Sequence, residues 1–269
     1  MSSAIRLIPL LVLASAAATC FAAPELRICA DPNNLPYSNE QQQGFENHLA
    51  GMIASDLGMK LSYVWYPQRS KFFERTLDAG VCDVVMGVPA GMEEAATTRP
   101  YYVSSYAFLS RRDCNLHITS FDDPRLNKLR IGVHILGESD DSVPPVHALI
   151  RRGIVRNLVG YSIFGHLGEV NPSADLIRAV VNRDVDIAVV WGPLAGYFAE
   201  KSSVPLEVTP ILADPAEPAL PMTWSIGIGV RPQDEALRQK LDHELERLHP
   251  RIQELLASYG IPQAMHGGN

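Results

Sequence analysis

The sequence is poor in cysteine, in aromatic residues and in positive charge. It has 4 cysteines among 269 residues, 7% of its residues are aromatic, and 23 basic residues stand against 30 acidic ones, which gives a net charge of −7. So few cysteines exclude a small scaffold held together mainly by disulfides. An acidic chain with scattered basic residues offers no continuous positive surface for a phosphate backbone, so nucleic acid is not expected as a partner.

Sequence motifs of enzymes and metal sites are also missing. The eight histidines form no HxxxH pair, the cysteines form no CxxC pair, and no GxSxG, GxGxxG or Walker sequence occurs. The adjacent carboxylates at Asp122-Asp123 and Asp140-Asp141 do not resemble a calcium-binding loop. We therefore expect no catalytic residues, no cofactor and no metal site.

Hydrophobic runs long enough to cross a membrane are absent. The apolar segment Leu7–Ala18 near the N-terminus is too short for a bilayer core, which needs about 20 residues, and it is typical of an export signal. Cleavage is expected after Ala22, which would make residues 1–22 a signal peptide and the mature protein periplasmic, with no membrane attachment. Acylation of Cys20 in a lipoprotein is the alternative, but the residues before it lack the usual leucine.

The rest of the chain contains the same unit twice. Leu26-Arg27-Ile28 recurs 103 residues later as Leu129-Arg130-Ile131, and Asp83 recurs at the same offset as Asp186. Each copy alternates strand-like and helix-like segments, which predicts βαβ units on a parallel sheet. In the first copy we expect strands Leu26–Ala30, Leu61–Trp65 and Asp83–Val88, and helices Glu46–Leu57 and Ser70–Ala79. In the second we expect strands Leu129–Val133, Asn157–Tyr161 and Asp186–Trp191, and helices Pro145–Arg152 and Pro172–Asn182.

Two further extended runs, Tyr101–Leu109 and Thr223–Val230, flank the second copy and are interpreted as strands that cross between two lobes. The amphipathic segment that follows, Asp234–Tyr259, is expected to form two helices separated at Pro250. The prediction is thus an α/β fold of two lobes, each a mostly parallel sheet flanked by helices. Lobe 1 would comprise residues 23–106 and 223–269, and lobe 2 would be the inserted residues 107–222, with ligands bound between the lobes at the strand ends.

Three cysteines remain after export, so at most one internal disulfide can form. Cys29 lies on the first predicted strand and Cys82 at the start of the third, and these strands are expected to be neighbours in the sheet. This favours a bridge between Cys29 and Cys82. A bridge between Cys82 and Cys114 is the other possibility.

Several motifs resemble known families. Gly44-Phe45-Glu46-Asn47-His48-Leu49, Asp78-Ala79-Gly80 and Arg99-Pro100-Tyr101-Tyr102 resemble the signature of type II periplasmic solute-binding proteins, family 3. A narrower resemblance is to the J-type proteins found beside PQQ-dependent methanol and other alcohol dehydrogenases. It implies a periplasmic accessory protein with a PQQ-dependent dehydrogenase as its partner, and it is carried by four motifs: Cys29–Ser38, Cys82–Gly91, Thr97–Tyr102 and Val189–Tyr197.

The chain departs from the amino-acid receptors of this fold at two positions. Gly91 stands where those receptors have an arginine that binds the ligand carboxylate, and Trp191 stands where they have an acidic residue that binds the ammonium group. An amino acid would leave both its charges buried and unpaired, which costs several kcal/mol per group. An amino-acid ligand is therefore not expected.

The predicted strand ends carry the candidate residues for a cleft that binds a partner or a small-molecule ligand. Trp65 and Trp191 are also compatible with a lobe core, Asn33 and Asn34 with a turn, and the arginines with surface ion pairs. An aromatic cleft with few charges suits an apolar anchor of a partner protein or a small neutral ligand, so a solute receptor of an ABC importer remains the alternative function. The candidates are Asn33, Asn34, Tyr37, Trp65, Arg69, Pro89, Gly91, Arg99, Tyr101, His134 and Trp191.

Overall fold

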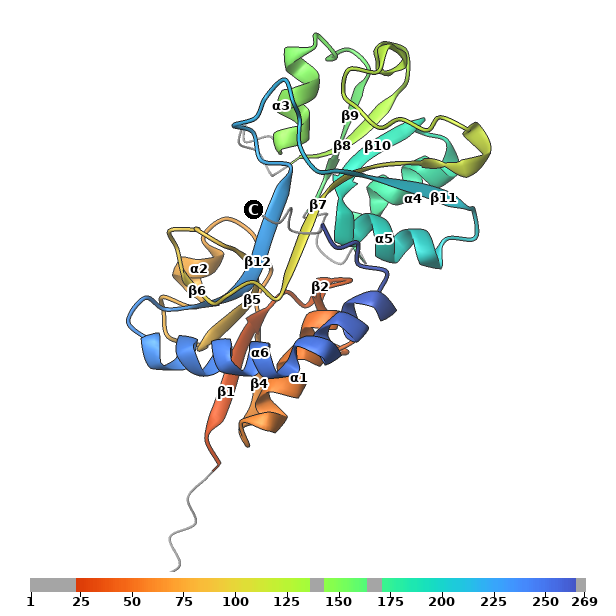
Figure 1. The fold of residues 1–269 in the computed structure, drawn as a ribbon. Helices are drawn as coiled ribbons and strands as arrows, with labels where there is room; N and C mark the ends of the chain where they lie inside the picture. Colours follow the sequence, from red (N-terminus) through yellow and green to blue (C-terminus); the bar gives the residue numbers. More distant parts are fainter. Residues whose placement is uncertain (1–22, 136–142, 164–170, 265–269) are drawn as a thin grey trace, which may run out of the picture.

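The computed structural model describes residues 23–135, 143–163 and 171–264, so the expected signal peptide at residues 1–22 lies outside the described residues. Figure 1 shows two α/β lobes joined by long strands. This confirms the fold class predicted from the sequence. No helix in the described ranges is long and apolar enough to cross a membrane.

Lobe 1 is built on three parallel strands. β1 (Glu25–Ala30) lies between β4 (Lys60–Trp65) and β5 (Val84–Pro89), and alternate residues of β1 point to opposite faces. One face is covered by α1 (Phe45–Asp56) and the long α6 (Glu235–Ser258), which bury the main core of this lobe. The smaller elements of lobe 1 are β2 (Asn33–Asn34), β3 (Ser38–Asn39), α2 (Phe72–Arg75) and β6 (Ala96–Thr97).

Lobe 2 repeats this arrangement. β8 (Ile131–Ile135) lies between the parallel strands β9 (Leu158–Ser162) and β10 (Ile187–Trp191), just as β1 lies between β4 and β5. The two faces of the sheet bury separate apolar clusters. The other elements of this lobe are η1 (Arg112–Cys114), η2 (Pro124–Asn127), α3 (Pro144–Arg151), η3 (Pro172–Ala174), α4 (Asp175–Asn182), α5 (Gly192–Lys201) and β11 (Leu206–Ile211).

Two antiparallel strands, β7 (Tyr102–Arg111) and β12 (Thr223–Val230), connect the lobes. The first half of β7 pairs with β12, and from Tyr106 onward β7 pairs with β10 and β11 of lobe 2. Ten of the described strands therefore form one sheet, whose main path has the order β4-β1-β5-β12-β7-β10-β8-β9. The long β7 is visible in Figure 1 as the strand that runs from one lobe into the other.

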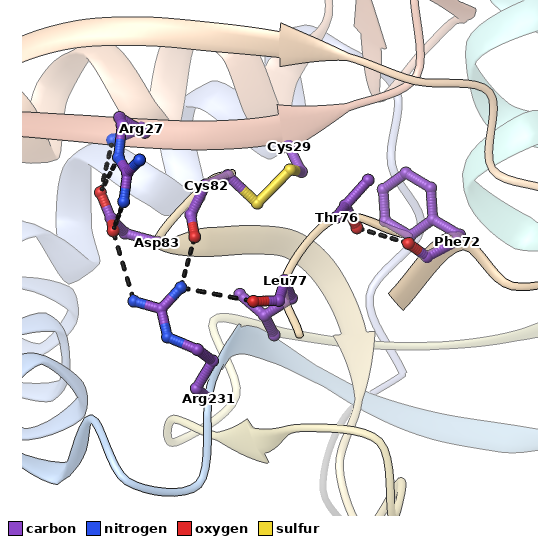
Figure 2. Close-up of a disulfide and its surroundings, with 8 residues drawn as sticks. All are labelled: Arg27, Cys29, Phe72, Thr76, Leu77, Cys82, Asp83 and Arg231. Atoms are coloured by element: carbon purple, nitrogen blue, oxygen red, sulfur yellow. Dashed lines mark hydrogen bonds and ion pairs between the residues drawn. A yellow bond between two sulfur atoms is a disulfide. The ribbon is translucent and has the colours of Figure 1, made fainter. Parts of the chain in front are cut away.

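The disulfide between Cys29 and Cys82 joins β1 to the segment before β5, with the two Cα atoms 5.6 Å apart. Sequence reasoning favoured this pair, and the structure confirms it. Figure 2 shows Arg231 beside the bridge: it donates hydrogen bonds to the carbonyl oxygens of Cys82 and Leu77 and lies 3.4 Å from the Asp83 carboxylate. The segment that precedes β5 is thus fixed by one covalent bond and several polar contacts.

Two sequence expectations for lobe 1 helices are corrected. The helix expected over Ser70–Ala79 is a single turn, α2, because Lys71 has a positive φ of 67° before it and Thr76 leaves the helical region after it. The helix expected to break at Pro250 continues through that residue as α6. Pro250 is exposed, so the carbonyl group that it leaves without an N–H donor faces water, while Leu248 and Ile252 on the opposite face stay buried in the same core.

Candidate functional site

A cavity of about 380 Å³ lies between the lobes, at the carboxyl ends of the strands. Its lining is mostly apolar and aromatic, and among the described residues that line it Glu46 is the only one with an acidic side chain, and none is a lysine, arginine or histidine. From lobe 1 and the crossing strands come Asn34, Tyr37, Glu46, Gln68, Met86, Gly87, Pro89, Tyr102, Trp224 and Ile226. From lobe 2 and its half of β7 come Tyr106, Val143, Pro144 and Trp191.

Glu46 lies in the first turn of α1 and is buried, with only 6% of the residue exposed. Its Oε1 accepts a hydrogen bond of 2.9 Å from the hydroxyl of Tyr101. Burial raises the pKa of Glu46 to about 7, and the Tyr101 hydrogen bond opposes part of this rise. The cavity therefore holds a carboxyl group that exchanges its proton near neutral pH.

Gly87 makes room for this carboxyl group. Its φ of +72° favours glycine, and a Cβ built on it would lie 2.5 Å from Glu46 Oε1. The Tyr101 hydroxyl, which lies beside the Gly87 backbone, donates to Glu46. Glu46 and Tyr101 thus form a hydrogen-bonded pair next to Gly87 at the lobe 1 wall of the cavity.

Trp191 forms the opposite wall. It ends β10, and its ring packs edge-on against Tyr106 with the ring centroids 5.2 Å apart. The Tyr102 side chain lies beside Trp191, and its pKa is raised well above its usual value by burial and by the charge of Glu46. Burial also raises the pKa of Tyr106 to about 12. These phenols therefore stay neutral, and both line the cavity.

The polar end of the cavity is positioned by Asp31, which follows β1. Its carboxylate accepts backbone hydrogen bonds from Asn33 at 2.8 Å and from Gln68 at 2.7 Å. Asn34 then donates from its side chain to Gln68 Oε1 at 3.1 Å. The loops that follow β1 and β4 are therefore held together, with two amide side chains at the cavity surface.

The lobes also touch outside the crossing strands. The backbone N–H of Asn171 in lobe 2 donates to Asn33 Oδ1 in lobe 1 at 3.0 Å. On the other side, α5 packs against the end of α6 so closely that a Cβ on Gly196 would overlap with the carbonyl oxygen of Gly260. Tyr197 and Tyr259 stack there with their centroids 5.7 Å apart. The structure thus holds the two lobes in contact around the cavity.

Four of the residues singled out from the sequence line the cavity: Asn34, Tyr37, Pro89 and Trp191. They come from the loop after β1, from the end of β5 and from the end of β10. These four positions lie together because the carboxyl ends of parallel strands meet at the same edge of a sheet, which is where ligands bind in folds of this kind.

Four other candidates do not line the cavity and have contacts elsewhere in the protein. Asn33 contacts Asn171 across the lobes, and Tyr101 is buried behind Glu46. Trp65 stacks on Tyr63 at 4.6 Å and packs against the lobe 1 core. His134 is buried in lobe 2, where its Nε2 lies 3.1 Å from the Ser173 carbonyl oxygen, and burial lowers its pKa to about 4.

The remaining candidates, Arg69, Gly91 and Arg99, also lie outside the lining. Arg69 lines a separate pocket beside α2. Gly91 has a φ of +87° and faces open space. Arg99 pairs with Glu246 at 3.0 Å, and its backbone N–H donates to Asp242, so it attaches the segment before β7 to α6.

Sequence reasoning missed Glu46 as a site residue, although a signal was present. Glu46 precedes Leu49 by three residues and Ile53 by seven, so it shares the apolar face of the predicted helix. A carboxylate on an apolar face is expected to have a specific partner or role. Tyr106 and Trp224 were missed because they lie on the crossing strands, whose inward faces depend on how the two lobes pack.

The described residues offer little to a metal ion. No group of three or more histidine, cysteine, aspartate or glutamate side chains within the described ranges is placed to hold one. What the cavity offers instead is a set of aromatic rings, two amides and one buried carboxyl group. This arrangement suits binding of a compact, partly apolar group.

Comparisons with known proteins give a consistent result. Residues 26–260 match the family described as bacterial extracellular solute-binding proteins, family 3. The chain is 29% identical to Protein MoxJ of Methylorubrum extorquens over 255 residues. This match spans 89% of this chain and 82% of that protein. It is 27% identical to Protein MoxJ of Paracoccus denitrificans, over 93% of this chain and 95% of that protein. The crystal structure of the periplasmic binding protein XoxJ from Methylobacterium extorquens AM1 matches with a TM-score of 0.74 at 30% identity, over 90% of this chain and 100% of that chain.

Proposed function

Because the chain belongs to the bacterial extracellular solute-binding proteins of family 3, we propose that it uses this scaffold as a periplasmic accessory protein of a PQQ-dependent methanol or alcohol dehydrogenase. In this role it binds the dehydrogenase or assists its assembly or activation. The similarity to MoxJ and XoxJ over most of the chain supports the proposal, as do the four sequence motifs of the J-type proteins.

One observation carries this proposal: each of the four motifs contributes to the wall of the cavity. Tyr37 belongs to the first, Gly87 and Pro89 to the second, Tyr102 to the third and Trp191 to the fourth. Segments far apart in the sequence thus meet at one surface. This convergence favours the interlobe cavity and its rim as the surface that recognises the partner.

Membership of this family supports two further inferences, one about location and one about catalysis. Extracellular solute-binding proteins act outside the cytoplasm, so we infer a periplasmic protein whose signal peptide is residues 1–22. N-terminal sequencing of the exported protein is expected to begin at Ala23. We further infer a binding role without turnover, and incubation with candidate alcohols and acids is expected to leave them unchanged.

The direct test measures binding and dehydrogenase activity with purified components. Mixing the protein with the dehydrogenase is expected to give a complex on size-exclusion chromatography or an increase in dehydrogenase activity. Trp191→Ala is expected to weaken this effect while the protein stays folded, because the ring lines the cavity. Trp65→Ala is the matched control and is expected to leave the effect unchanged, because both rings pack against the lobe 1 core and of the two only Trp191 lines the cavity. Neither a complex nor a change in activity with the wild-type protein would refute the proposal.

The second candidate function is a solute receptor of an ABC importer, which the two-lobed shape with a cavity of about 380 Å³ favours. Thermal unfolding in the presence of alcohols, organic acids and PQQ tests it, because a ligand that binds only the folded state raises stability by RT ln(1 + [L]/Kd). A ligand that raises the melting temperature, combined with no effect on the dehydrogenase, would favour the receptor over the accessory protein.

A further inference from the structure

Glu46 combines features that the accessory role does not explain. It is 6% exposed, it lies in the wall of the interlobe cavity, and among the described residues the Tyr101 hydroxyl is the one hydrogen-bond donor to its side chain. A buried carboxylate costs free energy unless it is paired or well hydrogen-bonded. A ligand in the cavity that donates a second hydrogen bond to this carboxylate would offset part of the cost of its burial.

The surroundings of Glu46 indicate the charge of that donor. No lysine, arginine or histidine is among the described residues that line the cavity, so none of these residues brings a positive charge to this carboxylate. The walls instead carry the rings of Tyr37, Tyr102, Tyr106, Trp191 and Trp224. Aromatic ring faces attract cations, most strongly where water is excluded. Both the carboxylate and the rings therefore favour a positively charged ligand with an apolar body.

The main chain is shaped to keep the carboxyl group at this place. Gly87 has a positive φ and no Cβ where one would collide with Glu46 Oε1, and the hydrogen bond from the Tyr101 hydroxyl orients the Glu46 side chain. The N–H groups at the start of α1 are used by the backbone: Phe45 donates to Pro36 and Glu46 to Tyr37. The cavity side of this turn therefore presents the carboxylate to a ligand rather than free N–H donors.

We propose that the interlobe cavity binds an organic ammonium group, whose N–H donors reach the Glu46 carboxylate while its carbon atoms lie against the aromatic walls. This inference goes beyond the accessory role and does not require that the dehydrogenase be the partner. The ammonium group belongs either to a small alkylamine in solution or to the lysine side chain of a bound protein. Glu46 and the rings would recognise the same chemistry in both cases.

The ionisable groups that face Glu46 allow a clear pH dependence. They are the phenols of Tyr37, Tyr63, Tyr101 and Tyr102 from four segments of lobe 1 and β7, and burial raises the pKa of each. All four stay neutral between pH 6 and pH 8, whereas Glu46 loses its proton in this interval. An alkylammonium ion keeps its charge over the same interval. Binding of the cation is therefore expected to strengthen as the pH rises.

Isothermal titration of the full-length exported protein with n-butylammonium chloride and with n-butanol tests the proposal. The two probes have similar shapes and differ in charge. We expect n-butylammonium to bind at pH 8 at least about tenfold more tightly than n-butanol, and about tenfold more tightly at pH 8 than at pH 6. Equal affinities for the two probes, an affinity for the amine that does not rise with pH, or no binding of the amine would each overturn the proposal.

Glu46→Gln removes the charge while it keeps the shape and an acceptor for Tyr101. This variant is expected to lose about tenfold or more in affinity for n-butylammonium and to lose the pH dependence. If it does not fold, as judged by thermal unfolding, Trp224→Leu replaces it, because it removes one ring from the wall and leaves Glu46 in place. That variant is expected to bind the amine more weakly with the pH dependence retained. Unchanged amine binding in the folded variant would overturn the proposal.

A third probe identifies the source of the ammonium group. N-acetyl-lysine methylamide carries the lysine side chain without backbone charges, and its Nε-acetylated form is the neutral control. Tighter binding of this probe than of n-butylammonium assigns the cavity to a protein lysine, and the reverse order assigns it to a free amine. Equal binding of the lysine probe and its acetylated control, together with no preference for the free amine, would contradict the role of the charge.

Discussion

Arg27 and Asp83 are joined by two side-chain hydrogen bonds, of 3.0 Å from Nε and 2.6 Å from Nη2. The same contact recurs between Arg130 and Asp186 in lobe 2, where Nη2 lies 2.9 Å from the carboxylate. In both lobes the pair ties the start of the central strand to the start of its neighbour, β5 or β10. The repeat seen in the sequence is therefore a repeat of ion pairs as well as of strands.

Asp83→Asn is expected to destabilise the protein by about 1.5–3 kcal/mol, because it leaves Arg27 without its carboxylate partner and removes one of the two carboxylates beside Arg231, the other being Asp234. Burial raises the pKa of Asp83, but hydrogen bonds from Arg27 and Arg231 and the charge of Arg27 outweigh this and leave it lowered. The contribution of Asp83 is thus present above the ordinary carboxyl pKa of about 3.9, and it is lost as the pH falls through the lowered value in the folded state. Urea unfolding between pH 7 and pH 3 measures both effects.

Asp186→Asn is the matched control for this experiment. The equivalent pair in lobe 2 is more exposed, with side-chain exposures of 52% for Arg130 and 34% for Asp186 against 38% and 18% for Arg27 and Asp83. Water screens the more exposed ion pair more strongly. Asp186→Asn is therefore expected to lower the free energy of unfolding by less than Asp83→Asn does. A larger loss of stability in Asp186→Asn than in Asp83→Asn would contradict this order.

Loss of the disulfide is a second test of lobe 1. The bridge closes a loop of 53 residues, and a loop of this length corresponds to about 4 kcal/mol of stabilisation through the unfolded chain. The double variant Cys29→Ala/Cys82→Ala is therefore expected to unfold at a clearly lower urea concentration than the wild type. Cys114→Ala, at the free and partly exposed cysteine, serves as the control and is expected to leave the midpoint unchanged.

The stability of Glu46→Gln relative to the wild type is expected to depend on pH in the opposite direction to that of Asp83→Asn. Burial raises the folded-state pKa of Glu46 from 4.5 to about 7, so the wild type loses stability as the pH rises through this interval. The glutamine side chain does not titrate, so the variant does not lose stability in this way. Its free energy of unfolding relative to that of the wild type is expected to rise by up to about 3 kcal/mol between pH 4 and pH 8 in urea unfolding. A difference that stays constant with pH would show that Glu46 titrates near its ordinary pKa.

Gly196→Ala tests the contact between α5 and the end of α6. A Cβ at this position would overlap with the Gly260 carbonyl oxygen, so the variant is expected to be destabilised by about 1–3 kcal/mol. Gly51→Ala is the matched control, because it lies within α1 with open space where the Cβ would be and is expected to stabilise the protein by about 1 kcal/mol. Thermal unfolding of the two variants in parallel should show shifts of opposite sign.

The sequence predicted the strands closely because their apolar runs are bounded by turn residues. β12 has the predicted limits Thr223–Val230, and α1 begins and ends one residue before the predicted helix. The pairing of Cys29 with Cys82 also followed from the expected strand order. Local patterns were sufficient in these cases, because the secondary structure that each segment prefers is also the one that buries its apolar residues in a lobe core.

Tertiary packing decided the features that were predicted incorrectly or not at all. Pro250 interrupts a helical hydrogen bond, but the buried residues Leu248 and Ile252 on either side keep α6 continuous. The cavity combines residues of both lobes with the crossing strands, and no local pattern gives the angle at which the lobes meet. Trp224 and Tyr106 could therefore be predicted as strand residues, but not as residues that line the same cavity as Glu46.

The end of the described chain adds a third connection between the lobes. Ser104 donates to the carbonyl oxygen of Pro262, Ala264 donates to that of Val103, and Gly260 lies against Gly196 of lobe 2. Two lobes that are connected by two strands alone can rotate apart through a large angle. In this protein the third contact must break before the lobes separate. Small-angle X-ray scattering is therefore expected to give nearly the same radius of gyration with and without an occupant in the cavity. Entry would then depend on side-chain movements at the rim.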